Sequence, residues 1–155
     1  MCLEPAFRGG RLGQMPQNVH RRQWQALART RLREATVLLD AGEWPGAYYL
    51  SGYAVECGIK ACAARQFPAQ TIPDFQIIRD LHSHKFEPLL KAAGLLPAFQ
   101  ADIRAEPALE VNWAIAKDWD AAKRYEIQSQ GEAEAMVAAI TDRRHGVMKW
   151  VRSKW

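Results

Sequence analysis

Apolar side chains recur every three or four positions along most of the chain, and this period predicts α-helices. Five stretches show it: 20–41, 45–66, 84–93, 97–116 and 131–153. We expect Pro107 to kink or interrupt the fourth, because proline removes a helical hydrogen bond. No alternation of apolar and polar residues persists long enough to propose a sheet. The pattern therefore predicts an all-α protein, an up-and-down bundle of about five helices.

The stretch 45–66 differs from the others because apolar residues surround nearly its whole circumference. A helix of that kind is buried on all sides, so we expect it to be the central helix. Its small residues Gly52, Ala54, Gly58 and Ala61 would let neighbouring helices approach closely.

Residues 1–18 hold two prolines and three glycines and show no period, so we expect a flexible tail there. The bundle would then occupy residues 19–155. Residues 67–83 contain Pro68 and Pro73 and are expected to be a long connection with at most a short helical turn.

The composition is that of one folded domain: 155 residues, 48% hydrophobic and 25% charged. The net charge of +4 permits an anionic partner such as RNA or a nucleotide, without requiring one. Cys2, Cys57 and Cys62 have no disulfide-framework spacing and are expected to be reduced, as in cytoplasmic proteins. No apolar run is long enough to cross a membrane, and no hydrophobic stretch follows Arg8 and Arg11 as in a secretory signal. We therefore expect a cytoplasmic protein.

Three motifs, in order, resemble those of HEPN domains (higher eukaryotes and prokaryotes nucleotide-binding). The first is Ala-Val-Glu followed one turn later by Lys-Ala, at 54–61, after an aromatic-rich start. The second is a His followed by Leu-Leu, at 84–90, and the third is Trp119 followed by Arg124-Tyr125. The resemblance implies a helical bundle that forms a homodimer. It also implies one of two roles, a metal-independent RNA-cleaving toxin or a non-catalytic companion of a nucleotidyltransferase.

Catalytic members of the family use an Arg followed four to six residues later by a His, and Arg79 with His84 is the match here. His can accept a proton near neutral pH, and the guanidinium can hold a phosphate with two hydrogen bonds. The family's motif usually lies just before the last helix, however, where this chain has Arg124-Tyr125. A random match of this length is also expected. The alternative is that His84 opens its helix and Arg79 is solvated.

Glu56 and Lys60 are four residues apart in the favourable order for an ion pair, on a helix expected to be buried. Buried charge requires a partner, and Lys60 and Arg124 are candidates to neutralise Glu56. With Tyr125 these residues form our candidate ligand-binding site: Glu56, Lys60, Arg124 and Tyr125. The alternative is a structural network without a ligand.

Basic residues also gather in the last predicted helix and in the first. They are Arg143, Arg144, Lys149, Arg152 and Lys154, with Arg29, Arg31 and Arg33. These would strengthen an RNA-binding hypothesis only if the two helices lie side by side.

The preferred interpretation is a non-catalytic HEPN-like module, homodimeric, that binds a nucleotide, nucleic acid or a nucleotidyltransferase partner in a toxin–antitoxin or defence pair. One alternative is a metal-independent endoribonuclease using Arg79 and His84. The other is a purely structural interaction domain. We expect no cofactor and no membrane partner. We also expect no metal site, because His82, His84 and Asp80 lack a fourth ligand.

Overall fold

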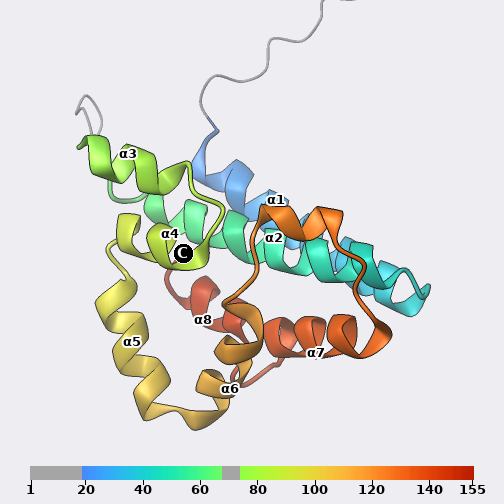
Figure 1. The fold of residues 1–155 in the computed structure, drawn as a ribbon. Coiled ribbons are helices and arrows are strands. Elements are labelled where there is room, and N and C mark those ends of the chain that lie inside the picture. The colour runs from blue at the N-terminus through green and yellow to red at the C-terminus, as the bar shows by residue number, and fades with distance from the viewer. Residues whose placement is uncertain (1–18, 68–73) are drawn as a thin grey trace, which may run out of the picture.

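A computed structural model describes residues 19–67 and 74–155, and the part described contains helices and no strand. The predicted tail at 1–18 lies outside the described residues. The expectation of an all-α protein is confirmed, but the described residues form eight α-helices and one 3₁₀ helix instead of about five helices (Figure 1). They are α1 Arg21–Asp40, α2 Trp44–Ala63, α3 Phe75–Leu81, α4 Phe86–Ala92, α5 Leu96–Ala105, α6 Pro107–Ala116, η1 Ala121–Tyr125, α7 Gln130–Thr141 and α8 Val147–Ser153.

The two long helices, α1 and α2, pack against each other as a hairpin (Figure 1). A capping box between His20 and Gln23 satisfies the first backbone N–H groups of α1. Gly42 ends it with a φ of 80°, a left-handed conformation that glycine adopts without strain. Pro45 then occupies the first turn of α2, where no N–H is required.

Helix α2 is the central element, as its apolar circumference predicts. Besides α1 it contacts α4, α7, α8 and η1, and 12 of its 20 residues are buried. Cys57 and Cys62 are both in the core, where burial raises the pKa of the Cys57 thiol to about 12 and that of Cys62 to about 11. Both side chains therefore act as small apolar residues, as expected.

Two glycines of α2 mark its closest contacts with other elements. A Cβ added to Gly52 would lie 2.3 Å from the ring of Trp119, and one added to Gly58 would lie 2.9 Å from Val151 of α8. Trp119 is almost completely buried, and its ring also stacks on Phe86 of α4, with centroids 5.4 Å apart. The small residues of α2 therefore let two other segments pack directly against its backbone. One is the connection between α6 and η1, and the other is α8.

The expectation of one last helix over 131–153 is wrong, because the chain turns between α7 and α8. Asp142 accepts hydrogen bonds from the backbone N–H groups of Arg144 and His145, which closes a tight turn. Gly146 approaches the carbonyl oxygen of Asp142 too closely for a side chain. The stretch 97–116 is likewise two helices, and Pro107 begins the second, as its position predicts.

The packing of Gly52 leads to a prediction about stability. Gly52→Ala should lower the free energy of unfolding by about 1–3 kcal/mol, because the new methyl group overlaps a buried indole. Gly131→Ala is the control, since nothing lies within 4 Å of its added Cβ. This change should leave stability unchanged or raise it by up to about 1 kcal/mol. Urea unfolding measures both, and equal effects would contradict the close contact.

Candidate functional site

A buried carboxylate with two hydrogen-bonding partners, a lysine and a histidine, lies on α2. Glu56 is 1% exposed, and its Oε1 accepts a hydrogen bond of 2.7 Å from Lys60 Nζ. His84 Nδ1 lies 3.1 and 3.2 Å from the two carboxylate oxygens. Since an ionised carboxylate only accepts hydrogen bonds, Nδ1 carries the proton in this pair. The expected pair of Glu56 and Lys60 is present, and His84, rather than Arg124, is the second partner.

Local structure explains why these three groups meet. Glu56 and Lys60 are one turn apart on α2, and the ammonium of Lys60 also lies 5.3 Å above the ring of Trp24 on α1. His84 belongs to the short connection between α3 and α4. The buried Phe86 anchors the start of α4 against the core and so fixes this connection beside α2. The imidazole remains 54% exposed and faces solvent beyond Glu56.

Arg124 and Tyr125 lie at the end of η1, against a different part of α2. The Arg124 guanidinium lies 4.7 Å from the centroid of the Tyr125 ring. The neighbouring hydroxyls of Tyr125 and then Tyr49 favour the charged guanidinium and raise the pKa of Arg124 above its usual value. Tyr125 is 79% exposed. The candidate site residues of α2 and η1 are therefore linked through Tyr49 and do not form one ion-pair network.

One face of α2 connects the two groups. Tyr49, Tyr53, Glu56 and Lys60 follow one another at spacings of four, three and four residues, which places them on the same side of the helix. We call these four residues the α2 stripe. The rings of Tyr49 and Tyr53 are stacked at 6.3 Å, and burial raises the pKa of Tyr53 to about 12, so its hydroxyl stays protonated.

Three segments surround this stripe. The connection that carries His84 and the 3₁₀ helix that carries Arg124 both lie over α2 in Figure 1. Helix α1 borders it with Trp24 and Arg31. The positive charge of Arg31 lowers the pKa of Tyr53, but burial raises this pKa by more. The stripe thus contains a stacked pair of tyrosines and the buried acid Glu56. Lys60 lies at one end of the stripe, and Arg124 of η1 lies near the other.

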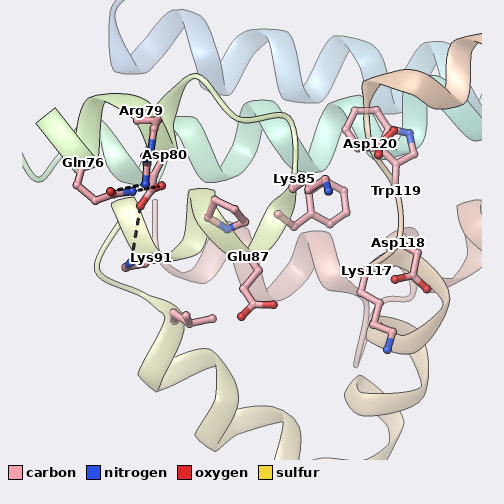
Figure 2. A pocket seen from close by; sticks show the side chains of 13 residues that line it. Gln76, Arg79, Asp80, Lys85, Glu87, Lys91, Lys117, Asp118, Trp119 and Asp120 are labelled. Atoms are coloured by element: carbon pink, nitrogen blue, oxygen red, sulfur yellow. Dashed lines mark hydrogen bonds and ion pairs between the residues drawn. The ribbon is translucent and has the colours of Figure 1, made fainter.

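A separate groove of about 560 Å³ contains Arg79 (Figure 2). Its walls come from α3, α4, the start of α5 and the segment after α6. Cations and carboxylates line it in equal numbers, four of each: Arg79, Lys85, Lys91 and Lys117, with Asp80, Glu87, Asp118 and Asp120. Figure 2 shows Arg79, Gln76, Asp80 and Lys91 gathered at one end, where Gln76 Nε2 donates a 2.8 Å hydrogen bond to Asp80.

The structure gives Arg79 and His84 different partners. The guanidinium of Arg79 donates to the side-chain oxygen of Gln76, one turn earlier on α3. His84 bonds to Glu56 instead, and it is not among the residues that line the groove of Arg79. Within the described residues, no contact joins the two side chains that the nuclease hypothesis pairs.

The motifs that resemble HEPN domains fall on α2, on the connection into α4 and on η1, the same segments that meet at the α2 stripe. No family model, curated protein or solved structure matches the chain. Among residues 19–67 and 74–155, no helix has both the length and the apolar character needed to cross a membrane.

The burial of Glu56 predicts which partner matters more for stability. Lys60→Met should lower the free energy of unfolding by about 3 kcal/mol, because the buried carboxylate loses its closest cation. His84→Asn should cost only about 1 kcal/mol, since the imidazole is half exposed. Urea unfolding of both variants tests this order. The double change Glu56→Gln with Lys60→Met should be milder than Lys60→Met alone, and the opposite order would contradict the role of Lys60.

Proposed function

We propose that this chain is a non-catalytic, HEPN-like helical module that binds a nucleotide on the α2 stripe. The observation that carries the proposal is that two cations, Lys60 and Arg124, and the imidazole of His84 come from three separate segments to one helix face with two stacked tyrosines. Aromatic faces and cations are the two kinds of group that recognise a nucleobase and its phosphates.

Each part of the stripe has a chemical task in this proposal. The rings of Tyr49 and Tyr53 would stack on the base, an interaction that tolerates any base because every base has a π-face. Arg124 is exposed at one end and would hold phosphate oxygens with its planar fork. At the other end His84 directs its second ring nitrogen away from Glu56, and Lys60 adds a point charge.

Glu56 would position the cations rather than touch an anionic ligand. Its carboxylate is buried, and both of its oxygens already have partners. Lys60 donates a hydrogen bond to Oε1, and Nδ1 of His84 lies within hydrogen-bonding distance of both Oε1 and Oε2. This arrangement holds the imidazole and the ammonium in fixed places and compensates the charge of the ammonium. We assign binding rather than catalysis because Arg79 and His84 have separate partners.

A partner chain belongs to the same proposal, whether a second copy or a nucleotidyltransferase. The segment from η1 to α7 exposes two apolar side chains beside the stripe, Tyr125 at 79% and Ile127 at 94%. We infer that a partner chain would cover these two side chains. A partner seated there would cover the Arg124 end of the stripe.

The proposal is tested by calorimetric titration with AMP and ATP. Arg124→Ala should weaken nucleotide binding at least tenfold, equivalent to about 1.4 kcal/mol, because it removes the phosphate fork. Its side chain is exposed, so the fold should be unaffected. Arg104→Ala, which removes an exposed arginine from α5, is the matched control and should bind like the original protein. Failure of the unchanged protein to bind, or equal binding by the two variants, would refute the proposal.

A further inference from the structure

The basic residues of α1 and α8 meet around one aromatic ring. The guanidinium of Arg29 on α1 lies 4.8 Å from the centroid of the Trp155 ring, and that of Arg152 on α8 lies 5.8 Å from the same centroid. The sequence left open whether the cations of these two helices share a surface. The shared contact with Trp155 shows that they do.

Next to this contact is a groove of about 400 Å³ between α1, α7 and α8. Three cations line it, Arg143, Lys149 and Arg152, and Leu32 of α1 forms the opposite wall. The groove has one acid, Asp142, whose carboxylate already accepts the backbone N–H groups of Arg144 and His145. Those bonds hold the pKa of Asp142 below its usual value, so it stays ionised with its charge engaged in the turn.

The cations here lack acidic partners. Among residues 19–67 and 74–155, Arg29, Arg143, Lys149 and Arg152 form no ion pair, whereas Lys154 lies 3.8 Å from Asp102 on another side of α8. Burial, and then the charge of Arg29, lower the pKa of Arg152. The guanidinium groups of Arg29 and Arg152 meet at the Trp155 ring without an acid between them, and an anion bound there would reduce their mutual repulsion.

The basic surface continues along α1. Arg22, Arg29 and Arg33 are spaced seven and four residues apart, so they lie on one side of the helix, and all three are exposed. Eleven residues of helix span about 16 Å. A row of that length exceeds what a single phosphate can contact, and it fits an anion with repeated charges.

This surface is separate from the α2 stripe. Gly58 packs on Val151 of α8, and it lies two residues from both Glu56 and Lys60 on α2. Two residues correspond to a rotation of about 200°. Helix α8 therefore covers the side of α2 that faces away from the stripe.

We propose that Arg29, Arg33, Arg143, Lys149 and Arg152 form a second site, which binds the phosphate backbone of RNA. Four of the five are arginines, whose planar fork matches phosphate oxygens better than a lysine ammonium does. This inference does not depend on the nucleotide site, and the two have separate tests.

The experiment measures binding of a fluorescent single-stranded RNA oligonucleotide by anisotropy at several salt concentrations. Each phosphate contact contributes about −0.7 to the slope of log K against log salt for a single strand. The double variant Arg29→Gln/Arg152→Gln should therefore show a slope shallower by about 1.4, with affinity at least tenfold weaker at low salt. Both residues are exposed, so the variant should fold, which its thermal unfolding checks.

The control Arg104→Gln/Lys117→Gln removes the same charge from exposed positions in α5 and after α6. It should keep the slope of the unchanged protein. Three results would each overturn the proposal. The first is an equal slope for the two double variants, the second is no RNA binding by the unchanged protein, and the third is displacement of RNA by polyglutamate at matched charge. Nucleotide titration of Arg29→Gln/Arg152→Gln should match the unchanged protein, which separates this site from the α2 stripe.

Discussion

The burial of α2 is the constraint on which the rest of the structure depends. A helix covered on nearly all sides must pack closely against each of its neighbours, and its small residues permit this. Trp119 packs against Gly52, and Val151 packs against Gly58. The same burial makes Glu56 costly unless it is paired, since an uncompensated charge in the interior destabilises a fold by several kcal/mol. Lys60 and His84 meet that requirement. The connection into α4 thus supplies one of the two partners of this carboxylate.

This constraint also explains why separate segments share one surface. Two shorter elements, the connection into α4 and η1, lie over the stripe of Tyr49, Tyr53, Glu56 and Lys60 (Figure 1). They carry His84 and Arg124, and each is anchored by an aromatic residue, Phe86 at the start of α4 and Trp119 before η1. Because those two rings stack on each other, the anchors of both segments belong to one packed unit.

Much of this arrangement could be predicted from the sequence, for physical reasons. The central helix and the pair of Glu56 and Lys60 follow from local spacing, which the sequence displays directly. The break between α7 and α8 was missed because Ile140 and Val147 are seven residues apart, so the apolar period continues across the turn. The signals available there were Asp142 and Gly146, a turn former and a residue without a side chain. Helix α3, at seven residues, is too short for any period to be visible.

The role of His84 could not be predicted from local spacing, because its partner is 28 residues away. The usable signal was indirect: a carboxylate on a buried helix with only one nearby cation requires another hydrogen-bond donor from elsewhere. Spacing within the sequence instead paired His84 with Arg79, which the structure places beside Gln76 in the groove of Figure 2. A short motif records which residues are close along the chain, and burial decides which are close in space.

The two basic surfaces differ in how their charge is compensated, and this difference bears on what each can bind. In the α2 stripe, Glu56 offsets the charge of Lys60, and the tyrosines offer stacking that does not depend on salt. In the groove between α1, α7 and α8 the one acid, Asp142, is engaged by backbone N–H groups, and beside the groove the guanidinium groups of Arg29 and Arg152 repel each other. An anion bound there gains mainly by release of counterions, which salt opposes directly. We therefore expect ligand binding on the stripe to depend less on salt than anion binding on the basic surface of α1 and α8.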